Sequence, residues 1–357
     1  MTEIETTELE APALPGLETV EPPHPTGERG RWIERGPSGK LMLFSGRSNR
    51  DLAQAIADTL NIELGDVELK TFANGEAYCR YHESIRGSDV FIVQSPHGRA
   101  VNDHLMELLI MIDAARLASA NRITAVMPWY PYSRQDKKSA PREPITAKLV
   151  AGFLESAGAD RVLTMDLHAG QIQGFFNIPV DHMTALPLFA NYFRDRGFSG
   201  PGVVAVSPDP GRAKTARRFA ELLEGDLAIL NKTRPEQDRA AVTDVIGHVK
   251  GKVAVMTDDL VVTGGTLIAG AEALLAAGAK CVYACATHAL VPEHAMKRLA
   301  DSDLEQIVLT DTVPVDRLNA PANLIILPVS HLLADTIRNV FSDESVSGLF
   351  PGGNQLF

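Results

Sequence analysis

The sequence predicts an α/β protein with two tandem, mainly parallel sheets flanked by helices. Short runs rich in Val and Ile lack the polar alternation of a half-exposed strand, as expected of strands that are covered on both faces. Stretches with helical periodicity separate these runs, and repeated strand–helix alternation is typical of parallel sheets. The chain has 357 residues, which is long enough for two domains. One large sheet is the alternative.

The strand–helix alternation begins at residue 41. The runs that predict strands are LMLF (41–44), VFIVQS (90–95), ITAVMPWY (123–130), RVLTMDLH (161–168), GVVAVSP (202–208), LAIL (227–230), KVAVMTDDL (252–260), CVYACATHAL (281–290), QIVLTDT (306–312) and LIILPV (324–329). Helical patterns cover 49–60, 144–158 and 265–278, where Pro144 suits a helix start and Gly278 a helix stop. We expect domains at 41–185 and 186–342, followed by a C-terminal segment, 343–357.

The first forty residues predict a disordered acidic tail. They contain six prolines, eight glutamates and a single aromatic residue, Trp32. Such a segment buries too little apolar surface to offset the entropy lost on ordering.

Composition narrows the class of protein. The net charge is −11, and −4 without the seven glutamates of residues 1–28, so a broad nucleic-acid surface is not expected. No stretch is long enough for a membrane span, and the N-terminus resembles neither a signal nor a transit peptide. Three cysteines (Cys79, Cys281 and Cys285) without a secretory signal suggest a reducing compartment. We expect a cytoplasmic protein without nucleic-acid or membrane partners.

Acids and a histidine follow three of the predicted strands, in DLH (166–168), SPD (207–209) and TDD (257–259). In open α/β sheets, ligands bind at the carboxyl ends of the strands. The sequence therefore predicts a binding site at this edge, although every strand must end somewhere and polar strand ends alone prove little.

The loop after residue 257 has the features of a sugar-phosphate site. Asp258 and Asp259 can accept hydrogen bonds from a vicinal diol. The segment TGGT (263–266) offers backbone amides and hydroxyl groups at a predicted helix start, which favours an anion. An N-capped helix after a solvated acidic turn is the alternative for TGGT alone.

This loop resembles the phosphoribosyl-diphosphate loop of phosphoribosyltransferase-like proteins, in which two acids and two other residues precede Asp-Thr-Gly-Gly-Thr. The resemblance implies that both domains have the phosphoribosyltransferase-like fold. It assigns ribose 5-phosphate to Asp258, Asp259, Thr263, Gly264, Gly265 and Thr266. Val262 stands where that pattern has an aspartate, which removes one carboxylate acceptor near the sugar.

A basic segment shows which member of this superfamily the sequence resembles. YPYSRQDKKSAPREPITAK (130–148) concentrates Arg134, Lys137, Lys138, Arg142 and Lys148 beside two tyrosines, and such a mixture suits a nucleoside triphosphate better than a solvated loop. No G-x-x-x-x-G-K-[ST] motif is present, which excludes a Walker-type ATP site. The segment resembles the ATP-binding stretch of ribose-phosphate diphosphokinases.

Further motifs of that family follow in order from residue 41 to 350. TFANGE (71–76), the basic segment and TMDLHAGQIQGFF (164–176) imply ATP contacts by Phe72, Asn74, Glu76, Arg134, Gln135, Asp136, Lys137 and His168, the first three across a subunit boundary. SPDPG (207–211) implies a magnesium site at Asp209 together with His168, although histidine is an unusual ligand for this metal. NKTRP (231–235) implies catalytic roles for Lys232 and Arg234.

The resemblance implies transfer of the diphosphoryl group of Mg-ATP to ribose 5-phosphate in a homo-oligomer, a hexamer in this family. It makes the first domain the ATP-binding one and the second the ribose 5-phosphate-binding one. QIQGFF (171–176) and SVSGLF (345–350) resemble a regulatory contact that takes a phosphate activator or an ADP inhibitor, with Gln173, Ser345, Ser347 and Phe350 as candidates. A core glutamine and an ordinary terminal segment are the alternative.

Two further positions depart from the family pattern: Arg212, where a second glycine is common, and Thr215, where arginine is frequent. Either change predicts altered phosphate affinity or regulation. The rival hypotheses are a non-catalytic regulatory paralogue, supported by Val262 alone, and a phosphoribosyltransferase, which leaves the basic segment without a purpose.

Overall fold

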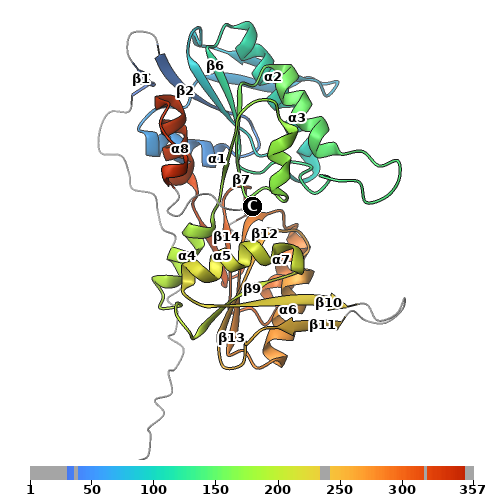
Figure 1. The fold of residues 1–357 in the computed structure, drawn as a ribbon. Coiled ribbons are helices and arrows are strands. Elements are labelled where there is room, and N and C mark those ends of the chain that lie inside the picture. Colours follow the sequence, from blue (N-terminus) through green and yellow to red (C-terminus); the bar gives the residue numbers. More distant parts are fainter. Residues whose placement is uncertain (1–29, 36–38, 234–241, 317–319, 350–357) are drawn as a thin grey trace, which may run out of the picture.

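The computed structural model describes residues 30–35, 39–233, 242–316 and 320–349. Two sheets lie one above the other, each flanked by helices (Figure 1). The prediction of an α/β protein with two mainly parallel sheets is confirmed. Within the described residues, no helix has the length and apolar character needed to cross a bilayer.

The first sheet has six strands in the order β1-β2-β5-β6-β7-β8. The strands are β1 (Ile33–Arg35), β2 (Gly39–Ser45), β5 (Asp89–Val93), β6 (Arg122–Met127), β7 (Arg161–Met165) and β8 (Val180–Met183). All neighbouring pairs are parallel except β1 with β2. The helices α1 (Arg50–Leu60), α2 (Val101–Leu117) and α3 (Thr146–Ala157) connect these strands. A hairpin of β3 (Val67–Thr71) and β4 (Ala77–Tyr81) packs on α2.

Ordered structure begins before residue 41, contrary to the predicted extent of the tail. β1 pairs with β2, placing Ile33 opposite Leu41. Trp32 donates a hydrogen bond to Glu34 over 2.9 Å, and the Lys40 ammonium lies 4.1 Å from the centre of its ring. These contacts involve Trp32 and Ile33, two large apolar residues near the end of a segment that has few apolar residues of this size. Residues 1–29 lie outside the described chain.

The second sheet has seven strands in the order β11-β10-β9-β12-β13-β14-β15. They are β9 (Val203–Ser207), β10 (Asp226–Thr233), β11 (Val242–Ile246), β12 (Val253–Val261), β13 (Cys281–Ala289), β14 (Gln306–Thr310) and β15 (Leu324–Leu327). Only β10 and β11 pair antiparallel. Its helices are α4 (Leu186–Arg194), α5 (Ala213–Leu223), α6 (Gly265–Ala276) and α7 (Glu293–Ala300).

The last helix, α8 (Ser330–Ser342), packs against α1 of the first domain, although the expected division assigned it to the second. Figure 1 shows it beside α1 and β2. Ile337 and Phe341 of α8 share a buried cluster with Leu52 and Ile56 of α1. Arg122 of β6 donates a hydrogen bond to Asp343 over 2.7 Å. The end of the chain therefore ties the two domains together.

The carboxyl ends of β7 and β13 meet directly. His288, completely buried in β13, has its Nε2 atom 3.1 Å from the carbonyl oxygen of Met165 in β7. The ring of Trp129, just after β6, lies 4.8 Å from the ring of His288, centre to centre. Because these contacts join strand ends, the chemical groups that follow the strands of both sheets face one space.

Candidate active site

A cleft of about 660 Å³ lies between the carboxyl edges of the two sheets. From the first domain it is lined by Arg134, Asp136, Lys137, Asp166, His168 and Gln171, and from the second by Arg212, Lys214, Asp258, Asp259 and Thr287, among others. Both cationic and acidic side chains line it. Such a lining suits a ligand that carries both phosphate groups and hydroxyl groups.

Asp258 and Asp259 reach the cleft because β12 is longer than its neighbour β9. β9 pairs with β12 only as far as Met256, whereas β13 continues beside β12 as far as Val261. The two acids therefore lie within the strand, as the predicted run 252–260 has them, and the loop begins only after Val261. Extension of the strand beyond β9 exposes them to the space between the sheets.

His168, Arg212 and Asp259 contact one another across the domain boundary. The Nδ1 atom of His168 lies 2.8 Å from Asp259 Oδ2 and 3.1 Å from Arg212 Nη2. The guanidinium of Arg212 also forms an ion pair with Asp259 Oδ1. The predicted ATP-binding histidine and the predicted ribose-binding acids are thus brought together. Arg212, which the sequence marked only as a departure from the family pattern, joins them.

The two neighbouring acids differ in pKa. Burial raises the pKa of Asp258 to about 8, and the Asp259 carboxylate beside it adds to the effect. Burial acts in the same direction on Asp259, but the hydrogen bond with His168 and the charge of Arg212 outweigh it and hold the pKa of Asp259 below its usual range. At neutral pH the pair therefore carries close to one negative charge.

The basic segment after β6 contributes Arg134, Asp136 and Lys137 to the cleft. Asp136 is buried and accepts a hydrogen bond from Gln171 Nε2 over 2.9 Å. This bond ties the segment to the turn that follows β7. Gln135, also predicted for ATP, lies outside this cleft and lines a neighbouring cavity with Arg134.

Asp166 is a cleft residue to which the sequence reading gave no role of its own. Its carboxylate accepts hydrogen bonds from Thr287 Oγ1 over 2.6 Å and from the Ala185 amide over 2.8 Å. Its backbone has a φ of 35°, which is uncommon for a residue other than glycine. The position of DLH (166–168) at the end of a predicted strand was the sequence signal that pointed to Asp166. The link to Thr287 depends on how the sheets meet, which no local pattern shows.

The TGGT loop stands beside the cleft, and its four residues are absent from the described cleft lining. α6 begins at Gly265, and its N-cap residue is Gly264, which has no side chain to cap the helix. Gly264 has a φ of 70°, and a Cβ atom there would lie 2.6 Å from Leu299, so glycine is required. Val262 lines a neighbouring, mostly apolar cavity of about 670 Å³ together with Trp129, Val291 and Pro292.

Comparison with known proteins decides the family. Residues 41–158 match the model for the N-terminal domain of ribose phosphate pyrophosphokinase, and residues 234–351 match that for the phosphoribosyl synthetase-associated domain. The Fusobacterium nucleatum ribose-phosphate pyrophosphokinase is 49% identical over 87% of this chain and 98% of the relative. The Nostoc enzyme of that name is 48% identical over 87% and 94%. The chain belongs to the ribose-phosphate pyrophosphokinase family.

A solved structure agrees with this assignment. The chain is similar to the crystal structure of phosphoribosylpyrophosphate synthetase from Mycobacterium smegmatis, with a TM-score of 0.79 and 44% identity over 85% of this chain and 99% of the other. The resemblance stated from the motifs is therefore confirmed, and so is the reading as an enzyme of this family. The comparisons lend no support to a non-catalytic paralogue.

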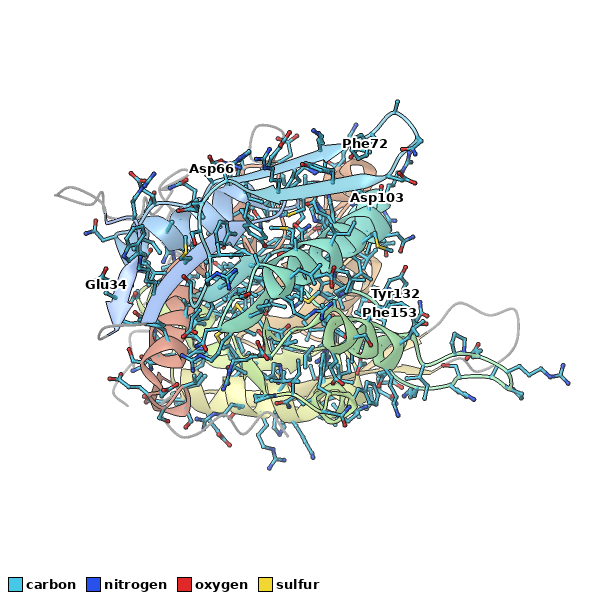
Figure 2. The ribbon with its side chains drawn as sticks, turned by 90° about the horizontal axis from the view of Figure 1, so that it is seen from above. Glu34, Asp66, Phe72, Asp103, Tyr132 and Phe153 are labelled. Atoms are coloured by element: carbon cyan, nitrogen blue, oxygen red, sulfur yellow. The ribbon has the colours of Figure 1, made fainter. Side chains whose placement is uncertain are left out.

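Several expected site residues of this pyrophosphokinase lie elsewhere. Phe72, Asn74 and Glu76 occupy the turn of the β3–β4 hairpin and are exposed, Phe72 by 46%. Figure 2 shows Phe72 on this protruding hairpin, apart from Tyr132 of the basic segment. Lys232 lies in β10, opposite Thr243 of β11, and Arg234 is outside the described residues.

The two expected metal ligands do not form a preassembled site. Asp209 does not line the cleft, and its side chain accepts hydrogen bonds from the amides of Gly211 and Arg212 over 2.7 Å and 3.2 Å. His168 Nδ1 is engaged with Asp259 and Arg212. In the part of the chain that is described, no group of three His, Cys, Asp or Glu side chains could hold a metal ion.

The expected regulatory residues are partly together. Gln173 and Ser347 line a cavity of about 540 Å³ with Arg161, Asp181 and His182. Ser345 Oγ lies 2.9 Å from Ser347 Oγ, and Phe350 is outside the described residues. Gln173 and His182 also line the main cleft, so the two spaces share a wall.

Proposed function

We propose that this pyrophosphokinase carries out its reaction in the cleft between the sheets. It transfers the diphosphoryl group of Mg-ATP to the C1 hydroxyl of ribose 5-phosphate and forms 5-phosphoribosyl 1-diphosphate and AMP. The observation that carries the proposal is the meeting of Arg134, Lys137 and His168 with Asp258 and Asp259 around one space. The first three suit a triphosphate, and the last two suit a sugar diol.

The ribose 5-phosphate would lie along β12 and the start of α6. Asp258 and Asp259 accept hydrogen bonds from the ring hydroxyl groups, and the backbone of the TGGT loop, with the hydroxyl of Thr263, receives the 5-phosphate. Amides at a helix start and the helix dipole both favour an anion. This arrangement directs the C1 hydroxyl toward the first domain, where Arg134 and Lys137 would hold the triphosphate.

In the reaction, the C1 oxygen forms a bond to the β-phosphorus of ATP, and the bond from that phosphorus to the α–β bridging oxygen breaks. AMP leaves with the bridging oxygen, and the C1 hydroxyl releases its proton. Catalysis of such transfers depends on alignment and on neutralising charge at the nonbridging oxygens. We assign the last role to Lys232, which lies in β10 opposite the antiparallel strand β11, and to Arg234, which is outside the described residues.

Magnesium fits this site as an ion that arrives with the nucleotide. Protein sites for Mg²⁺ usually combine one or two carboxylates with substrate phosphates, and the described residues hold no preassembled cluster of three protein ligands. His168 and Asp209 would be its protein contacts. The ion would neutralise phosphate charge in the nucleotide.

The position of the β3–β4 hairpin supports a shared site. Phe72, Asn74 and Glu76 are exposed in the turn of the hairpin and outside the described lining of the cleft, so we infer that they contact the adenine bound by another subunit of a homo-oligomer. We assign the phosphate activator and the ADP inhibitor to the cavity of Gln173 and Ser347, together with Ser345 and Phe350.

The three free cysteines agree with a reducing, cytoplasmic location.

Kinetics of AMP formation test the cleft. Arg134→Ala and Lys137→Ala each remove a charged hydrogen-bond donor, worth about 1.5–3 kcal/mol, so we expect kcat/KM for ATP to fall by about 10–150-fold. Lys250→Ala is the control, since Lys250 is exposed in the turn before β12 and outside the described cleft lining. A loss in Lys250→Ala equal to that in the cleft variants would defeat the proposal.

A further inference from the structure

Arg212 places a positive charge between the two acids of the cleft. It occupies the N-cap position of α5 without a side-chain cap hydrogen bond, and its side chain contacts the acids near the end of β12. The guanidinium forms an ion pair with Asp259 Oδ1, and its Nε atom lies 3.8 Å from Asp258 Oδ1. The side chain of Arg212 is only 15% exposed, and those of Asp258 and Asp259 are 17% and 4% exposed.

His168 completes the surroundings of this guanidinium, with its Nδ1 atom 3.1 Å from Arg212 Nη2. That nitrogen also lies 2.8 Å from Asp259 Oδ2. A single ring nitrogen either donates to the carboxylate or accepts from the guanidinium, and in both cases it belongs to the same cluster. Two carboxylates and an imidazole therefore converge on Arg212.

These are donor groups of the kind that divalent cations take, and a buried carboxylate needs a positive charge beside it. In phosphate-handling sites a free metal ion often supplies that charge. Here a guanidinium does so, and it keeps its charge at every physiological pH. This agrees with the absence of any three-ligand metal cluster from the described chain.

We propose that Arg212 is a built-in cation that takes the place of a free divalent metal ion at Asp258 and Asp259. The only metal ion that the enzyme then needs is the one carried in by its nucleotide. Arg212 is a positioning residue in this scheme, because it holds the two acids in place for the sugar and His168 in place for the nucleotide. The inference rests on the proposed function of the cleft, but its main test does not require turnover.

The test titrates the full chain with Mn²⁺ in the absence of nucleotide. Electron paramagnetic resonance measures how many Mn²⁺ ions each chain binds. Arg212→Ala should bind one Mn²⁺ per chain more than the wild type, because the acids lose their counter-charge and space opens for a hydrated ion. Lys214→Ala is the matched control, since Lys214 lines the same cleft two residues away. It should bind no additional ion, and Asp259→Asn added to Arg212→Ala should remove the new site.

A kinetic measurement distinguishes the proposed role of Arg212 from the proposed function of the cleft. With Mg-ATP held constant and saturating, free Mg²⁺ should raise the rate of Arg212→Ala several-fold and leave that of the wild type unchanged. Loss of all turnover in the wild type would overturn the proposed function and leave the Mn²⁺ test standing.

Equal Mn²⁺ binding by the wild type and Arg212→Ala would overturn the role of Arg212. If Arg212→Ala lacks a cooperative unfolding transition, Arg212→Gln carries the same test, because glutamine keeps a polar side chain while removing the charge. Arg212→Lys should keep the wild-type stoichiometry.

Discussion

Asp258 and Asp259 are neighbours in β12, yet their surroundings push the pKa values of their carboxyl groups in opposite directions. Burial next to a second acid raises the pKa of Asp258 to about 8. Asp259 is held below its usual range, despite its burial, by His168 and Arg212. At the residue scale the cleft therefore contains one acid that retains its proton at neutral pH and one that is ionised.

This difference predicts unequal costs for matched substitutions at pH 7. Asp258→Asn replaces a mostly protonated carboxyl by a neutral amide of the same shape, so we expect the unfolding free energy to change by less than about 1 kcal/mol. Asp259→Asn leaves Arg212 without its buried countercharge, and breaking such pairs costs about 3–5 kcal/mol. Urea unfolding of both variants measures this, and equal costs would refute the assignment.

The pH dependence of unfolding for the same variants shows whether each carboxyl group raises or lowers stability as the pH rises. The folded pKa of Asp258 lies above its reference value of 3.8, so the folded state binds the proton more tightly between pH 4 and 8. Wild-type stability should therefore fall relative to Asp258→Asn as the pH rises through that window. For Asp259 the folded pKa is depressed, so its contribution is present above pH 3.8 and is lost as the solution becomes more acidic.

At the scale of elements, α8 is a helix from the second half of the chain that completes the first domain. Ile337 is fully buried in the cluster that joins α8 to α1. Substitution of a buried isoleucine by alanine typically costs about 2–5 kcal/mol.

We therefore expect Ile337→Ala to lower the unfolding free energy by about 2–5 kcal/mol and to speed hydrogen exchange in α1. Arg338→Ala is the control, because Arg338 is half exposed and pairs only with Asp335 among the contacts described. Unchanged exchange in α1 of Ile337→Ala would mean that α8 does not support the first domain.

The strand runs predicted both sheets because parallel strands covered on two faces are continuously apolar. The short strands β1 and β8, the hairpin β3–β4 and the strand β11 were missed, since their sequences lack such runs. The placement of α8 could not be predicted either. An apolar stripe shows that a helix packs on something, not which domain it joins.

For the site, the strand-end rule identified His168, Asp258 and Asp259, and the structure brings these together. The contacts of Arg212, Asp166 and Thr287 escaped prediction because they arise only where the two sheet edges meet. Position 262 is a similar case. Its valine reads as a lost acid in the sequence, but in the structure it lies in an apolar cavity beside Trp129.

On the scale of the whole molecule, two sheet edges meet so that a nucleotide held by one domain faces a sugar held by the other. This geometry accounts for transfer of a diphosphoryl group between them. Phosphorus-31 NMR of the purified protein with Mg²⁺, ATP and ribose 5-phosphate tests it most directly. The account predicts AMP and a sugar diphosphate with two mutually coupled phosphorus signals. Formation of ADP with a ribose bisphosphate, or of orthophosphate, would contradict it.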